Sequence, residues 1–230
     1  MGTASSALLL ASLLVSGPVV AAAGPGPTEL DRLTALAPDL RPAVLARALA
    51  ALACTSEPDL AQSRVLAVID YARPSTERRL WVFDRRGPQL LFHTLVAHGS
   101  GSGENFAERF SNRHHSRASS LGLYRAAETY DGRNGYSLRL DGLDPGINDQ
   151  ARSRAIVVHG AAYVTPAFAE QHHRLGRSWG CPALEPSTAR PIIDALRQGG
   201  ALFISAEDPD WLRQTAALTC KSSPAPERAK

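Results

Sequence analysis

The stretch Leu175–Leu184 reads LGRSWGCPAL and places one of the chain's three cysteines between a glycine and a proline. A structural cysteine is usually a small apolar side chain within a hydrophobic run of a strand or helix. Cys181 lies instead in a segment that predicts a tight turn, because Gly180 permits unusual backbone angles and Pro182 fixes its own φ. This pattern indicates a cysteine held in place for chemistry.

A histidine at the end of a predicted strand supplies a second group for thiol chemistry. The run Arg154–Gly160, RAIVVHG, has the short apolar pattern of a buried strand that ends at His159. A thiol becomes a strong nucleophile as a thiolate, which a neighbouring imidazole generates by accepting the proton. Because a connecting loop and helix can bring residues 159 and 181 together, we predict Cys181 as nucleophile and His159 as base.

The turn around the cysteine also predicts a site for a developing negative charge. The backbone N–H groups of Gly180 and Cys181 are expected to form an oxyanion hole, in which one donor lowers the barrier by roughly 3 kcal/mol. Ser178 is close enough to lend its hydroxyl to the turn. The carbonyl of Gly160 is expected to accept the other ring N–H of His159.

Several separate blocks of sequence resemble the murein L,D-transpeptidases, whose fold is called YkuD-type. These blocks are HGSGSG, FSN, SSLG, VVHGAAYV and GRSWGCPAL. The common family motif is His-Gly at a strand end followed by Ser-His-Gly-Cys. Here it corresponds to His159-Gly160 and to residues 178–181, with Trp179 in place of the second histidine, as in a divergent subfamily. The resemblance spans about residues 65–205 and leaves the helical N-terminus outside.

The resemblance implies an activity on the peptide stems of peptidoglycan, without a cofactor or a metal. Cys181 would attack the carbonyl of the diaminopimelate residue in a tetrapeptide stem, release D-alanine, and pass the acyl group to an amine of a second stem. Two alternatives remain open. Water can serve as acceptor, which makes the enzyme an L,D-carboxypeptidase or endopeptidase, or the domain can be a non-catalytic cell-wall binding module. Trp179 is a candidate wall that excludes water.

Five residues are candidates for binding the substrate, and each has an alternative structural role. Arg177 can pair with a stem carboxylate through the fork of its guanidinium group. The others are His98, Trp179, Tyr163 and Asn112. The pairs His114-His115 and His172-His173 do not predict a metal site, because no zinc-type spacing accompanies them.

The N-terminus and the remaining cysteines indicate an oxidising compartment. An apolar run that ends in Ala21-x-Ala23 is typical of a secretory signal peptide, with a hydrophobic first helix of a cytosolic domain as the alternative. We therefore expect a periplasmic or secreted, cell-wall associated protein with no stable membrane span after cleavage. Cys54 and Cys220 can form a disulfide, although three free thiols are also possible. The net charge of +3 does not indicate a nucleic-acid partner.

The pattern along the chain predicts a mostly β (α+β) domain with an N-terminal helical cover, and the resemblance makes the body an L,D-transpeptidase-like β-sandwich. Short, mainly antiparallel strands and long loops are expected between residues 99 and 148. The expected divisions are a signal peptide at 1–23, a helical segment at 24–60, the catalytic domain at 61–208, and a C-terminal helix with a disordered tail at 209–230. Helices are also expected at 165–173 and 187–198.

Overall fold

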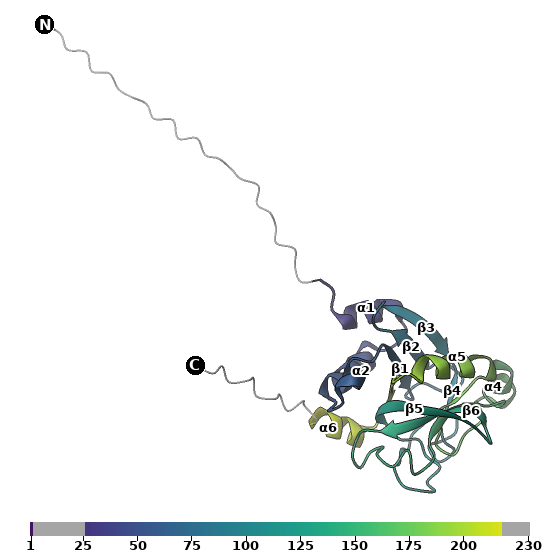
Figure 1. The fold of residues 1–230 in the computed structure, drawn as a ribbon. Coiled ribbons are helices and arrows are strands. Elements are labelled where there is room, and N and C mark those ends of the chain that lie inside the picture. The colour runs from purple at the N-terminus through teal and green to yellow at the C-terminus, as the bar shows by residue number, and fades with distance from the viewer. Residues whose placement is uncertain (2–25, 218–230) are drawn as a thin grey trace.

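The computed structural model describes Met1 and residues 26–217, which form one curved sheet with helices packed on it (Figure 1). The nine strands run in the order β3-β2-β1-β9-β5-β6-β7-β8-β4. The expected signal peptide and the tail after residue 217 lie outside the described residues. Cys220 lies there too, so the bridge from Cys54 to Cys220 stays a prediction.

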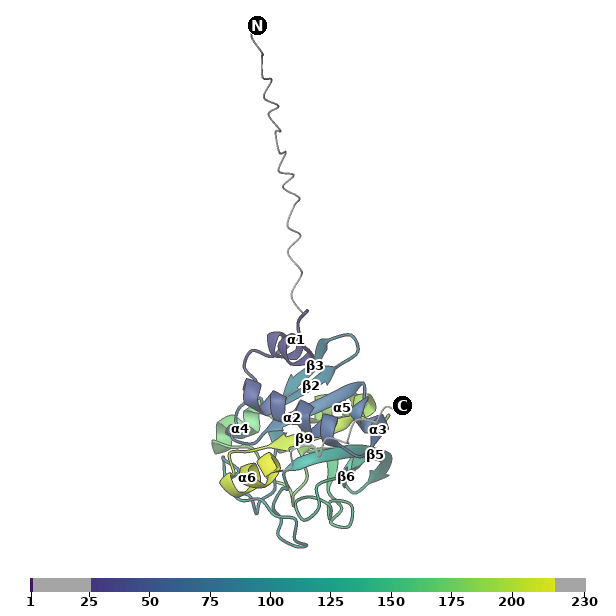
Figure 2. The same ribbon diagram turned by 90° about the vertical axis from the view of Figure 1, so that its left-hand side faces the viewer.

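The N-terminal cover consists of α1 (Glu29–Leu36), α2 (Pro42–Cys54) and the short α3 (Pro58–Ala61). The side chain of Thr28 caps α1 and forms a capping box with Asp31. The break between α1 and α2 falls where the sequence predicts it, whereas α3 replaces part of an expected loop. The buried side of α2 packs against β1, β5 and β9, so that α2 crosses in front of the strands in Figure 2.

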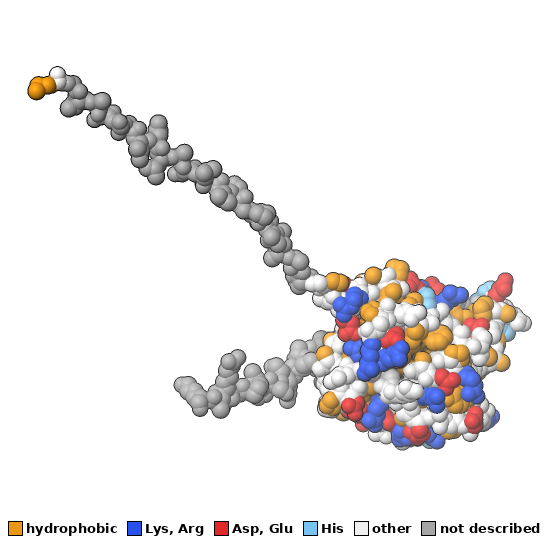
Figure 3. Space-filling view, turned by 45° about the horizontal axis from the view of Figure 1, so that its top comes forward, with side chains coloured by type: hydrophobic (Ala, Val, Ile, Leu, Met, Phe, Trp, Pro, Cys, Tyr) orange, Lys and Arg blue, Asp and Glu red, His pale blue; other side chains and the backbone are white. Residues whose placement is uncertain are grey.

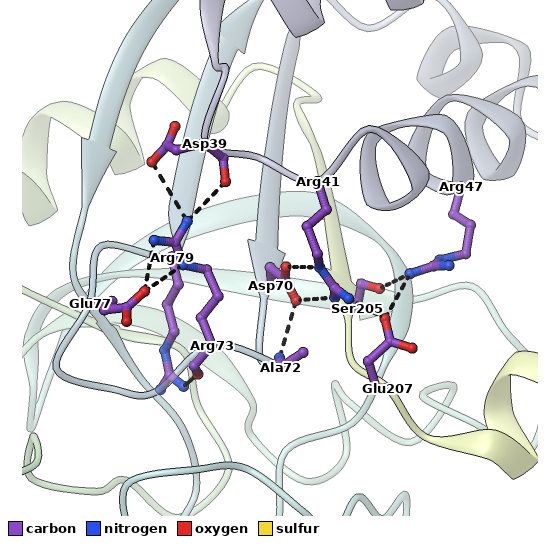
Figure 4. Close-up of polar contacts among 10 residues, drawn as sticks. All are labelled: Asp39, Arg41, Arg47, Asp70, Ala72, Arg73, Glu77, Arg79, Ser205 and Glu207. Carbon is purple, nitrogen blue, oxygen red and sulfur yellow. Dashed lines mark hydrogen bonds and ion pairs between the residues drawn. The ribbon is translucent and has the colours of Figure 1, made fainter.

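Charged residues fasten this cover to the sheet (Figure 4). Arg41, the residue before α2, donates from Nε and Nη2 to the two carboxylate oxygens of Asp70, each over 2.8 Å. Asp70 ends β1 and its side chain is fully buried. Arg41 also pairs with Glu207, which follows β9. The helical segment therefore shares one core with the sheet and is not a separate lobe.

The first half of the sheet contains β1 (Val65–Asp70), β2 (Leu80–Asp84), β3 (Gln89–Thr94) and β9 (Ala201–Ser205). All residues of β1, β2 and β9 are buried, which explains why these segments are nearly continuous apolar runs in the sequence. β1 pairs antiparallel with β2 and parallel with β9. The strands expected around residues 65–84 and 201–205 are confirmed.

The middle of the chain forms a longer hairpin than expected. β5 (Gly122–Gly132) and β6 (Gly135–Gly142) pair along most of their length, with Gly132 opposite Gly135 across a two-residue turn. Gly135 has φ of 70°, a value that favours glycine. A register shift between Ala126 and Thr129 interrupts the regular pattern. The expectation of short strands was wrong for this hairpin, whereas long loops are present on either side of it, at residues 98–121 and 143–156.

The second half of the sheet contains a parallel pair joined by a helix. β7 (Val157–Gly160) leads through α4 (Pro166–His172) to β8 (Ala183–Leu184), which pairs parallel with β7 and antiparallel with β4 (Val96–Ala97). This crossover and the pairing of β1 with β9 are the parallel exceptions among the described strands, and the other pairs are antiparallel as expected. The sheet curves, and as a consequence a single helix, α5 (Pro186–Leu196), contacts β1 as well as β6 and β7. The mostly β (α+β) class with a helical cover is confirmed.

A last helix, α6 (Pro209–Ala217), follows β9. Its Trp211 is buried, and the ring centroid lies 6.1 Å from that of Phe203 in β9. None of the helices within the described residues has the length and hydrophobicity of a bilayer span. On the face drawn in Figure 3, basic and acidic side chains lie next to one another.

Candidate active site

The parallel pairing of β7 and β8 brings His159 and Cys181 close together. His159 lies directly opposite Ala183, and Cys181 precedes Ala183 by two residues. With strands about 4.8 Å apart and a rise of about 3.3 Å per residue, the two Cα atoms are about 8 Å apart, within reach of an imidazole and a thiol. The crossover through α4 therefore makes neighbours of two residues that are distant in sequence.

The ring of His159 is oriented by the backbone of the next residue. Its Nδ1 lies 2.9 Å from the carbonyl oxygen of Gly160, which only accepts hydrogen bonds. Nδ1 therefore carries the proton, and Nε2 has the free lone pair that a general base needs. Burial of the ring lowers the pKa of His159 below its usual 6.5, against the opposing effect of the Gly160 carbonyl. The resting imidazole is neutral at pH 7.

The thiol of Cys181 continues the hydrogen-bond ladder of β7. Its sulfur accepts the backbone N–H of Val157 over 3.4 Å and lies 3.7 Å from the carbonyl oxygen of Ala155. The residue is only 8% exposed, and this burial raises the pKa of the Cys181 thiol. Within residues 26–217 no hydrogen bond joins the sulfur to the His159 ring. The resting pair is therefore a neutral thiol beside a neutral imidazole.

A serine holds the turn that carries the cysteine. The Ser178 hydroxyl donates to the carbonyl oxygen of Cys181 over 2.6 Å and accepts the N–H of Gly180 over 3.1 Å. The Gly180 N–H is thus engaged inside the turn and differs from its expected role in an oxyanion hole. The N–H of Cys181 donates to no other residue in the described part of the chain. It remains available to a substrate oxygen.

The backbone around the thiol leaves no room for a side chain at Gly180. This residue has φ of 122°, and an added Cβ would lie 2.8 Å from the carbonyl oxygen of Ala118 and 2.9 Å from Ile156. Ala118 belongs to the loop 98–121, which contacts the turn at a second residue as well. Ser119 accepts the N–H of Gly99 and donates to the carbonyl of Gly180, each over 3.0 Å. The turn is therefore fixed by its contacts with this loop.

Three of the predicted substrate-binding residues lie around this turn. Trp179 is 69% exposed, and the guanidinium carbon of Arg117 lies 4.9 Å from its ring centroid, so that the ring is an exposed rim and does not enclose the thiol. Arg177 donates to the carbonyl of Gly103 over 3.1 Å and pairs with Glu104. Tyr163 is half-buried; burial, followed by the charge of Cys181, raises its pKa to about 12.

The other two predicted substrate-binding residues have different surroundings. His98 is fully buried, and its Nδ1 accepts a hydrogen bond from Arg79 over 2.8 Å, which places the ring behind the site. Burial and the nearby arginine lower its pKa to about 3. The amide of Asn112 contacts the side chain of Asp149 and the backbone of Gln150 in a partly exposed loop.

Two residues near the thiol were missed in the sequence. Ser119 lies in the block SSLG, and Arg154 begins the run RAIVVHG. The sequence spacing of neither residue predicts its contact with the turn. Across the described residues, no three histidine, cysteine or acidic side chains gather as metal ligands would. A surface hollow of about 1030 Å³ lies at α3 and β3 and does not include Cys181 or His159. The candidate site is therefore assigned by its chemistry and not by this hollow.

Comparison with known proteins identifies the family. The model of the L,D-transpeptidase catalytic domain matches residues 36–205, so the match includes α2 and begins earlier than expected from the sequence motifs. No curated protein sequence matches significantly. Because the matched region covers more than half of the chain, the family assignment rests on this match.

The similar solved structures are distant. An L,D-transpeptidase from Mycobacterium smegmatis shares 15% identity at a TM-score of 0.39, with 62% of this chain and 59% of that chain covered. An L,D-transpeptidase from Stackebrandtia nassauensis shares 15% identity at a TM-score of 0.39, with 77% of this chain and 76% of that chain covered. The helical cell shape determining protein of Campylobacter jejuni shares 11% identity at a TM-score of 0.39, with 63% of this chain and 48% of that chain covered. By the family match, the chain belongs to the L,D-transpeptidase catalytic domain family.

Proposed function

We propose that this protein is a cysteine L,D-transpeptidase that cross-links peptide stems of peptidoglycan through a thioester on Cys181. The observation that carries this proposal is the register of β7 and β8, which sets His159 beside Cys181. The hydrogen bond from His159 Nδ1 to Gly160 supports it, because this bond leaves Nε2 free to accept a proton.

The first half of the proposed reaction forms the acyl-enzyme. A rotation of the Cys181 side chain brings the thiol to His159, whose Nε2 accepts the proton as the S–H bond breaks. The thiolate attacks the carbonyl carbon of the diaminopimelate residue, and the N–H of Cys181 donates to the resulting oxyanion. The intermediate collapses to a thioester, and D-alanine leaves with the proton held by His159.

The second half transfers the acyl group. An amine of a second stem attacks the thioester carbonyl while His159 accepts its proton, and the Cys181 sulfur leaves and is protonated again. Water is the alternative acceptor, which would make the enzyme an L,D-carboxypeptidase or endopeptidase. The exposure of Trp179 favours keeping this alternative, because an exposed ring does not close the thiol off from solvent.

The proposed place of action is outside the cytoplasmic membrane, at the cell wall. The substrate class lies there, and the N-terminal apolar run predicts export. N-terminal sequencing of the protein recovered from its native host would show whether the chain begins near residue 24.

The test is incubation of the purified protein with stem tetrapeptides, followed by mass spectrometry. We expect release of D-alanine, formation of stem dimers and a covalent adduct of a carbapenem on Cys181. Cys181→Ala and His159→Asn should abolish the first two, whereas His114→Asn, an exposed histidine whose ring contacts the Ser153 hydroxyl, should leave them unchanged. D-alanine release without dimers would favour water as acceptor. If the folded protein gives no product and no carbapenem adduct, the result would favour a binding module.

A further inference from the structure

Arg154 carries a positive charge into the wall of the site, and none of the carboxylates in the described part of the chain pairs with it. The residue lies immediately before β7 and is half-buried. Its guanidinium donates to four neutral oxygens: the carbonyls of Ser111 and Ala118, at 2.7 and 2.6 Å, and the hydroxyls of Ser120 and Ser116, at 2.7 and 3.3 Å. No salt bridge to Arg154 occurs among the described residues.

The neighbouring Arg152 shows the usual arrangement. It lies two residues earlier and pairs with both Glu128 and Asp141 on the surface. A charge held away from solvent without such a partner is costly, and burial lowers the pKa of Arg154 accordingly. The contrast indicates that a negative charge formed elsewhere in the site is the natural counterpart of Arg154.

The nearest group that acquires such a charge is the thiol of Cys181. An added Cβ on Gly180, the residue before the cysteine, would lie 3.3 Å from Nη2 of Arg154. The carbonyl of Ala155, the residue after Arg154, lies 3.7 Å from the Cys181 sulfur. Residues 154 and 155 therefore lie against residues 180 and 181, and this places the guanidinium near the turn that carries the sulfur.

The other titratable groups that face the sulfur do not provide a positive charge at rest. They are Tyr71 after β1, Tyr163 after β7 and the neutral ring of His159. The backbone N–H of Val157 donates to the sulfur but carries no net charge. The only other titratable group whose charge acts on Arg154 is the buried phenol of Tyr124. Arg154 is thus the one cation acting on the thiol within the described residues.

We propose that Arg154 stabilises the negative charge that forms on the Cys181 sulfur when the thiol loses its proton. Arg154 does not contact the sulfur, so it is a positioning residue and not a catalytic one. It is held in place by the loop 111–120, so this loop determines where the positive charge lies. The role of the thiolate in cross-linking rests on the proposed function. The stabilisation of the thiolate by Arg154 can be measured without any substrate.

The test is the rate of alkylation of Cys181 by iodoacetamide as a function of pH, with intact protein analysed by mass spectrometry. In Arg154→Met the midpoint should rise by about one pH unit, so that the rate below it falls about tenfold. Arg154→Lys keeps the charge and loses the fork of hydrogen bonds, and its midpoint should stay close to that of the unmodified protein. Arg152→Met is the matched control and should have no effect.

A purely structural role gives a different result. If Arg154→Lys and Arg154→Met shift the midpoint equally, or if neither shifts it, the proposal is wrong. A measurement on the unmodified protein covers the case in which these variants do not fold. The guanidinium ¹⁵N resonances of Arg154 should shift with the same pH midpoint as the thiol, and should not in Cys181→Ala; their absence of response would overturn the proposal. If the alkylation midpoints shift as expected but the protein does not cross-link stem peptides, only the proposed function is refuted.

Discussion

The sulfur of Cys181 accepts the backbone N–H of Val157, two residues before His159 on the neighbouring strand. This bond holds the thiol in the hydrogen-bond ladder of the sheet, two residues along the strand from His159, its proposed base. Because the sulfur is buried and neutral there, the site at rest holds an unreactive thiol. In the proposed mechanism, activation requires the sulfur to leave Val157 and reach the free Nε2 of His159.

The acid limb of the pH profile should report the burial of His159. The base works only when its ring is neutral, so activity is lost as the pH falls through the pKa of His159 in the free enzyme. Burial lowers this pKa below the usual 6.5. The value of kcat/KM for D-alanine release should therefore persist below pH 6.5 and fall only in more acidic solution. An acid limb centred above pH 6.5 would contradict this expectation.

Gly180→Ala should damage the turn through both strain and collision. A side chain at φ of 122° is strained, and its Cβ would lie 2.8 Å from the Ala118 carbonyl oxygen. We expect a loss of at least about 2 kcal/mol in the free energy of unfolding, with activity falling in parallel. Gly146→Ala is the matched control, since it has φ of 76° and open space, and should cost only about 1 kcal/mol. Urea denaturation measures both, and equal losses would rule out the collision.

His98 should make the fold sensitive to acid. Its pKa is lowered to about 3 in the folded protein, so between pH 6.5 and 3 the unfolded chain binds one more proton at this site. The contribution of His98 to the free energy of unfolding is fully present above the pKa of histidine in the unfolded chain. It is lost as the pH falls below that pKa, by up to about 1.4 kcal/mol per pH unit. His98→Asn retains an acceptor for Arg79 and should reduce the slope of unfolding free energy against pH by about one proton.

The matched control for this slope is His173→Asn. His173 is exposed at the end of α4, with φ of 56°, a conformation that asparagine tolerates. Its replacement should leave the slope unchanged. If His98→Asn has the same slope as the unmodified protein, His98 does not resist protonation in the fold.

Removing Arg41 should loosen the helical cover. Arg41→Ala deprives the fully buried carboxylate of Asp70 of its ion pair, although the N–H of Ala72 still donates to it. Since Arg41 itself is 40% exposed, we expect a loss of about 2 kcal/mol, less than for a pair buried on both sides. Arg213→Ala removes an exposed pair with Asp210 and should cost less than about 0.5 kcal/mol. Thermal unfolding compares the two, and equal costs would contradict the expectation.

Local patterns explain which parts of the fold were predictable. Thr165 followed by Pro166 starts α4, and the buried runs VLAVID and LWVFD form β1 and β2, because capping and continuous burial leave direct marks in the sequence. The length of the β5–β6 hairpin was not predicted. Its burial pattern is irregular and a register shift interrupts it, so no clean alternation marks these strands.

The candidate site divides in the same way. Cys181, Gly180 and Ser178 lie within four residues, and their types alone predict a turn built around a thiol. Ser119 and Arg154 approach this turn from other segments, and a serine in a polar loop or an arginine before a strand resembles many solvated residues. The engagement of the Gly180 N–H by Ser178 was also unpredictable, because hydrogen-bond directions within a turn depend on its backbone angles.

The sequence by itself determined the chemistry of the thiol turn, the histidine at a strand end and the helical cover, because residue type, local backbone preference and hydrophobic spacing act over a few neighbouring positions. Only the tertiary structure decided that β7 and β8 run parallel and in the register that joins His159 to Cys181. It alone also decided that Arg154, which has no carboxylate partner in residues 26–217, lies against the same turn. Strand register and the approach of a loop depend on packing between distant segments, which no local pattern records.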